Sequence, residues 1–169
     1  MNPTTSQSLD IARLRALFIE QLSILYNAKI NLTARLPQLT RQATFNNLKL
    51  ALEEDFEDNN RKMVALKKIF QLMQESWLTN SCLGINAVID EAHKQVVFDK
   101  AKHFESDMSI LFYMSVIENL QVGASKMLNL MALKIAYQPY AQLVGETLDI
   151  VKDNASLFYC VAEEYLQYN

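Results

Sequence analysis

Polar side chains interrupt four apolar stripes of the sequence, and these are the residues that could do chemistry. Lys29 falls in register with the leucines around it, with Leu25 on one side and Leu32 on the other. Glu118 and Gln121 are three residues apart, so on a helix they share one face. Further polar residues interrupt such stripes at Asp55, Asp58, Asn59, Lys62 and Asn154. Because the interior of a helical protein is normally apolar, these positions form one candidate site.

A polar layer halfway along four helices is where ferritin-like bundles place a dinuclear metal centre. Such a centre needs about four carboxylates together with His or further carboxylates. The sequence offers Glu118 and one or two Asp, and its histidines, His93 and His103, fall outside the long apolar stripes. Lys29 and Lys62 add ammonium groups, which repel metal ions. We therefore expect a charged and amide cluster in place of the metal, made of Lys29, Asp58, Lys62, Glu118, Gln121 and Asn154.

The composition indicates that long helices must position these residues. Half of the 169 residues are hydrophobic, which is enough for a sizeable core, yet the chain has only 3 Gly and 3 Pro. Folds rich in strands need many turns, which Gly and Pro favour. No stretch of useful length alternates between apolar and polar residues, and neither GxGxxG nor GxxxxGK[ST] occurs. The sequence therefore predicts few, long elements and no phosphate-binding loop.

The apolar spacing predicts four long helices and one short one. Residues 1–8 read as a flexible tail, and 9–168 as a single domain. Ser8, Thr44 and Ser81 are the expected N-caps, and Pro37 is expected to kink or end the first helix. The long helices are expected from Leu9 to about Leu39 and over about 45–75, 107–137 and 139–167, with the short one over about 82–97.

The order of these helices predicts an all-α fold. Two hairpins of long helices are joined by a long crossover that contains the short helix. This is the topology of a ferritin-like four-helix bundle with an extra helix between the second and third long helices.

Charge and hydropathy exclude several classes of protein. The net charge is −3 and no basic run exists, so we expect no binding to nucleic acid. The most apolar stretch, 108–136, is interrupted by polar residues, which argues against a membrane span. Two cysteines make no disulfide framework and no signal peptide is evident, so we expect a cytoplasmic protein.

Several short segments, in order, resemble the YciE/YciF-type ferritin-like proteins of bacteria over about residues 13–166. The segments are 17–22 followed by 25–29, Leu36-Pro37, Cys82 with 87–91, Ile117-Glu118-Asn119-Leu120-Gln121, and Thr147-Leu148-Asp149-Ile150-Val151. The resemblance implies a homodimeric, metal-binding helical protein linked to stress responses.

The sequence departs from that family's pattern at the positions that would bind metal. Lys29 replaces an acidic residue, and Gln121 replaces a glutamate. Ile150 and Val151 replace two more glutamates, so that Glu118 alone carries over unchanged. Asn119 replaces a histidine, and Asp58 and Lys62 occupy the region of the second helix's ligands. We therefore interpret the chain as a non-catalytic member with no expected cofactor and a structural or stress-related role.

Two alternatives remain open at this point. The first is an altered iron or manganese site, with Glu118, Asp58 and Asp55 as ligands. The second is a helical interaction module that binds a partner protein through the apolar outer surface of the third long helix. That helix carries few charges, so we expect a homodimer that covers it. For Glu118 a structural role as a buried carboxylate paired with Lys29 or Lys62 is the favoured interpretation.

Overall fold

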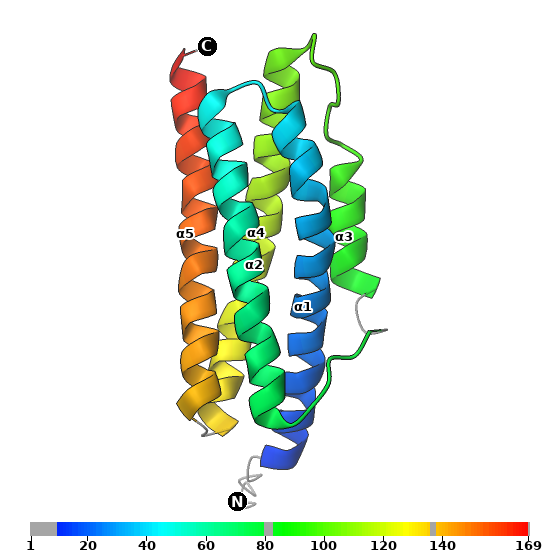
Figure 1. Ribbon diagram of the computed structural model, residues 1–169, viewed down its shortest axis with the longest axis vertical. Helices are drawn as coiled ribbons and strands as arrows, with labels where there is room; N and C mark the ends of the chain where they lie inside the picture. The colour runs from blue at the N-terminus through cyan, green and yellow to red at the C-terminus, as the bar shows by residue number, and fades with distance from the viewer. Residues whose placement is uncertain (1–9, 80–82, 136–137, 169) are drawn as a thin grey trace, which may run out of the picture.

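The computed structural model describes residues 10–79, 83–135 and 138–168 and contains five helices there. Four long helices lie side by side, and the short helix packs on the outside of the first (Figure 1). The helices are α1 (Ile11–Gln42), α2 (Asn46–Met73), α3 (Leu83–His93), α4 (His103–Ile135) and α5 (Gln138–Tyr168). The described residues form no strand, and the predicted bundle with a short helix in its crossover is confirmed.

The long helices pack as two antiparallel hairpins, α1 with α2 and α4 with α5. Side-to-side contacts of α1 with α4 and of α2 with α5 close the bundle. The crossover carries α3 back along α1, where the Asp90 carboxylate accepts hydrogen bonds from Asn31 and Arg35. Those contacts attach the short helix to the outside of the bundle.

The apolar core is divided into two halves along the bundle. One half surrounds Leu32, Leu52 and Ile117, and the other surrounds Leu22 and Leu66. The polar side chains picked out from the sequence lie on the helices between these halves, because the apolar repeat is interrupted at the same level in every long helix. The core is therefore two apolar layers with one polar layer between them.

The boundaries of four helices differ from the predictions. The first helix does not end at Pro37 but continues to Gln42, because Leu36 and Leu39 on either side are fully buried and hold it. The third long helix begins at His103 instead of Asp107. Its first turn is charged and so shows no apolar repeat. The second long helix ends at Met73 and the short helix at His93, earlier than predicted.

The N-caps also differ from the predictions. Thr44 does not cap α2; Phe45 occupies that position and makes no side-chain capping bond. Instead the buried Asp107 carboxylate of α4 accepts hydrogen bonds from the Thr44 and Phe45 amides, at 2.8 and 2.9 Å. The first helix is capped by Asp10, whose side chain accepts from the Arg13 amide. The predicted tail and the predicted caps Ser8 and Ser81 lie outside the described residues.

No helix in the described part of the chain is both long enough and apolar enough to cross a lipid bilayer.

Candidate functional site

All four long helices contribute to the polar layer. Lys29 comes from α1, Glu118 and Gln121 come from α4, and Asn154 comes from α5. The second long helix contributes the most, with Asp55, Asn59 and Lys62 on one face at spacings of four and three residues. Every one of these side chains is buried, and water does not reach the charged groups. Burying so many polar groups is costly unless they are hydrogen-bonded, and the contacts within the layer satisfy most of them.

On one side of the layer, Gln121 links Lys29 to Glu118. The Lys29 ammonium Nζ donates to Gln121 Oε1, and Gln121 Nε2 donates to Glu118 Oε1 at 3.0 Å. The sequence favoured a pairing of the Glu118 carboxylate with Lys29 or Lys62. In the structure Gln121 lies between Lys29 and Glu118, whereas Asn154 donates to Asp55.

On the other side, Asp55 is the centre of the contacts. It accepts a hydrogen bond from Asn154 Nδ2 at 2.6 Å and another from Asn59 Nδ2 at 2.9 Å. The Asn59 carbonyl lies 3.4 Å from Lys29 Nζ. Lys29 therefore contacts two amide carbonyls, and the nitrogen of each amide donates to a buried carboxylate.

The second buried lysine lies between the two carboxylates. Lys62 Nζ is 3.6 Å from Asp55 Oδ1 and 4.0 Å from Glu118 Oε2. Within the described part of the chain, neither Lys62 Nζ nor Glu118 Oε2 has a partner at hydrogen-bond distance. With Lys29 included, two ammonium groups face two carboxylates, and the layer is close to neutral when all four are charged.

Burial and mutual repulsion shift the protonation of these groups. Burial raises the pKa of Glu118 to about 7, with the Asp55 carboxylate adding to the shift and the two lysines opposing it. Burial also lowers the pKa of Lys29 to about 7, helped by repulsion from Lys62 and opposed by both carboxylates. The pKa of Asp55 is raised by burial and held down in part by the two lysines. A proton moved from Lys29 to Glu118 would leave the net charge of the layer unchanged.

These residues do not fit a dinuclear metal centre. In ferritin-like proteins two helices each give a Glu and the other two each give a Glu-x-x-His pair. Here the layer holds Asp55 and Glu118 as its carboxylates, and the Lys62 ammonium takes the space between them where a cation would bind. Across residues 10–79, 83–135 and 138–168, no group of three or more His, Cys, Asp and Glu is arranged to hold a metal.

Asp58 lies beside the layer, without a hydrogen bond to it among the described contacts. Its carboxylate pairs with Arg61 on the next turn of α2. Both residues line a pocket between α2 and α5 of about 420 Å³ that Asn154 also lines. Asp58 therefore belongs to the mouth of that pocket.

Sequence reasoning left two members out of the expected cluster. Asn59 and Asp55 both contact other members of the layer. The sequence analysis placed both on interrupted apolar stripes but gave Asp55 a role only in the alternative metal site. Their spacing to Lys62 would have placed them on one helical face. The capping role of Asp107 had no signal in the sequence, because its partners lie on a different hairpin.

Comparisons with known proteins agree with this fold. The chain matches the family described as Domain of unknown function (DUF892) over residues 13–167. Protein YciF of Escherichia coli is 21% identical over 142 residues, which are 83% of this chain and 85% of that protein.

Two solved structures are similar over nearly their whole length. The crystal structure of the Escherichia coli stress protein YciF superposes with a TM-score of 0.85 at 20% identity and covers 92% of this chain and 98% of that one. YcfI of Rhodopseudomonas palustris, described as a candidate structural protein, gives 0.78 at 19% identity, with 94% and 98% covered. At such identities the structures establish the fold, and the family match establishes the relationship. The chain belongs to the DUF892 family, the ferritin-like proteins of the YciF type.

Proposed function

We propose that this chain is a non-catalytic ferritin-like protein whose polar layer replaces a di-metal centre. In this proposal the ammonium groups of Lys29 and Lys62 provide the positive charge that metal ions would otherwise supply. The observation that carries it is the position of Lys62 Nζ, 3.6 Å from Asp55 and 4.0 Å from Glu118. A cation fixed to the chain between two carboxylates needs no cofactor to balance the buried charge.

The role that follows is structural or stress-related, in a bacterial cytoplasm. The relatives support it in part: one is a stress protein by its description and another a candidate structural protein. The buried layer supports it as well, because its charged groups are not exposed to solvent. The alternative is an altered iron or manganese site that uses Glu118 of α4 with Asp58 and Asp55 of α2.

Metal analysis separates the two functions. Protein purified without chelator should contain iron and manganese well below one equivalent per chain. The matched variant Lys29→Glu with Lys62→His restores a carboxylate and an imidazole to the layer, and we expect it to take up metal. Stoichiometric iron or manganese in the unmodified protein would support the alternative.

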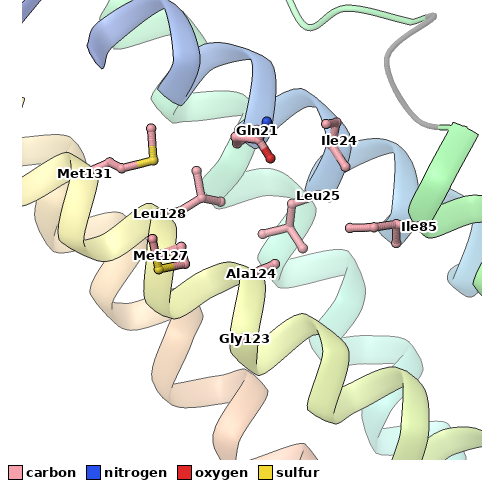
Figure 2. A pocket seen from close by; sticks show the side chains of 9 residues that line it. All are labelled: Gln21, Ile24, Leu25, Ile85, Gly123, Ala124, Met127, Leu128 and Met131. Carbon is pink, nitrogen blue, oxygen red and sulfur yellow. The ribbon is translucent and has the colours of Figure 1, made fainter.

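We also propose that the protein is a homodimer that covers the outer face of α4. Asp107 and Glu118 are buried, so the exposed surface of this long helix carries few charges. Phe112, Met127 and Leu130 are 72%, 59% and 58% exposed on it. Of these three, Met127 also lines an apolar groove of about 220 Å³. Figure 2 shows it between α1 and α4, with side chains such as Ile24 and Met127 around it and Ile85 of α3 at one end.

An uncovered apolar stripe of this kind marks an interaction surface. A second copy of the chain is the occupant that the family resemblance implies. Light scattering during size-exclusion chromatography should give twice the mass of one chain. A clean monomer at micromolar concentration would instead leave the surface to a different partner protein.

A further inference from the structure

One face of α4 carries a stripe of exposed residues that runs along the whole helix. Glu105 lies in the first turn and Lys134 in the last turn, and both are exposed. The exposed positions between them keep to one helical face, with Lys126 at its edge, and are mainly apolar: Phe112, Val116, Asn119, Gly123, Met127 and Leu130. The stripe therefore has an acidic end, a mainly apolar middle and a basic end.

Two apolar grooves open along this stripe, one on each side of its midpoint. The first, of about 220 Å³, lies between α1 and α4 (Figure 2). The second, of about 380 Å³, lies between α4 and the end of α3, where Ala92 and Gln95 line it. Three lining residues of α4, spaced four apart, belong to each groove: Gly123, Met127 and Met131 to the first, and Met108, Phe112 and Val116 to the second. If the direction of the helix is reversed, one set of three takes the place of the other.

We propose that two copies of the chain pair their α4 helices antiparallel, about a twofold axis that passes between Asn119 and Leu120. The inference rests on the proposed homodimer and deepens it, because it names the residues of the second copy that cover each groove. In this register Phe112 of one copy lies opposite Met127 of its partner, and Val116 lies opposite Gly123. The groove beside α3 in one copy then faces the groove beside α1 in the other.

The charges at the ends of the stripe select the antiparallel direction. In the proposed register Glu105 of each copy lies opposite Lys134 of its partner, which gives two pairs of opposite charges. In a parallel pairing each Glu105 would face the other Glu105, and each Lys134 the other Lys134. Like charges placed opposite each other at an interface weaken association. The stripe is thus complementary to itself only when one copy is reversed.

The apolar part of the stripe suits the same pairing. Phe112 and Met127 are its most exposed apolar side chains, at 72% and 59%, and in this register each would be covered by the other. A Cβ atom added at Gly123 would meet nothing within 4 Å among the described residues beyond its own turn of helix, so packing within one copy does not require glycine there. Glycine inside a helix is less stable than alanine. Opposite Val116 of a second copy, however, the missing side chain lets the two helices approach closely.

Cross-linking of the full chain tests the register. In a background of Cys82→Ser and Cys160→Ser, Asn119→Cys places a thiol beside the twofold axis, and we expect a short bis-maleimide to link two copies. Phe112→Cys is the matched control on the same exposed stripe. Its counterpart in the second copy lies about 22 Å away along the helix, so it should stay unlinked. Combining Phe112→Cys with Met127→Cys should restore the link.

Charge reversal provides a second test. Glu105→Lys and Lys134→Glu each place like charges at both ends of the pairing, and each should raise the dissociation constant of the dimer by about tenfold or more. Both changes in one chain restore opposite charges and should recover dimerisation. Each change also opposes the helix dipole of α4. If they acted only through the stability of that helix, the double variant would therefore be the weakest dimer, and the proposal would be wrong.

The outcomes distinguish this proposal from the proposed homodimer. Self-linking of Phe112→Cys as readily as of Asn119→Cys would show a parallel pairing. A dimer in which Asn119→Cys stays unlinked would overturn the register and leave dimerisation itself standing. A monomeric unmodified chain would overturn both.

Discussion

Lys62 is the residue on which the charge balance of the layer most depends. It lies between Asp55 and Glu118, and within the described chain Glu118 Oε2 has no hydrogen-bond partner. Removing one partner of a buried ion pair leaves an uncompensated charge. In the proposed replacement of a metal by ammonium groups, Lys62 is therefore the most important side chain.

We predict that Lys62→Met lowers the free energy of unfolding by about 3–5 kcal/mol, the usual cost of stranding a buried charge. Chemical denaturation measures it. Adding Glu118→Leu to the same chain should recover part of that loss, because one stranded carboxylate is then absent. Lys68→Met, at an exposed lysine on the same helix, is the control and should change stability by less than about 0.5 kcal/mol. Equal effects of the two Lys→Met changes would contradict the ion-pair account.

The protonation of Glu118 predicts a pH dependence. Burial raises its pKa from 4.5 to about 7, so between these values the folded chain holds a proton there that the unfolded chain has lost. The stabilising contribution of Glu118 must then fall as pH rises through that window. The unfolding free energy of the unmodified protein should decrease relative to that of Glu118→Gln from about pH 4.5 to about pH 7. A constant difference across the window would show that Glu118 is ionised throughout.

The residues of the layer could be found from the sequence, but their pairing could not. Lys29, Lys62, Glu118, Gln121 and Asn154 each interrupt an apolar stripe, and that signal is local. Which ammonium group faces which carboxylate depends on how the helices turn toward one another. That rotation is set by packing across the whole bundle. The sequence of a single helix does not determine it.

At the scale of elements, the turn between α1 and α2 depends on a residue of α4. Asp107 accepts hydrogen bonds from the amides of Thr44 and Phe45 and from the Thr44 hydroxyl. It thereby satisfies amide groups at the start of α2, which has no side-chain cap of its own. One buried carboxylate thus joins the two hairpins at this end of the bundle.

We predict that Asp107→Ala costs about 1–3 kcal/mol of unfolding free energy, because the half-buried amides of Thr44 and Phe45 lose their acceptor. Asp107→Asn keeps one acceptor oxygen and should cost less. Asp149→Ala removes an exposed carboxylate on α5 and is the control. If thermal unfolding of the alanine variant matches that of the control, the cross-hairpin cap contributes nothing.

The elements themselves were predictable where the apolar repeat continues without a break. Five helices and their order follow from that repeat and from the scarcity of Gly and Pro. The wrong predictions all concern the ends of helices, where the apolar repeat does not set the boundary. His103 begins α4 within a charged segment, and α1 continues past Pro37 because buried leucines on both sides outweigh the lost backbone hydrogen bond.

At the scale of the whole molecule, we propose that the outer face of α4 forms the dimer interface. Met127 and Leu130 are exposed there beside the apolar groove between α1 and α4. We predict that Leu130→Glu converts the proposed dimer to a monomer, because a charge would be buried at the interface. Light scattering measures the mass, and Val64→Glu on α2, also at an exposed apolar position, is the matched control that should leave the dimer intact. Dissociation by both variants, or by neither, would place the interface elsewhere.

The thermal unfolding of the unmodified protein with added metal tests the central claim most directly. A ligand that binds only the folded state raises the melting temperature. If Lys62 and Lys29 already balance Asp55 and Glu118, iron(II) or manganese(II) at one or two equivalents should leave the melting temperature unchanged. The variant Lys29→Glu with Lys62→His should respond under the same conditions. A rise of several degrees in the unmodified protein would show that the site still binds metal and would contradict the account.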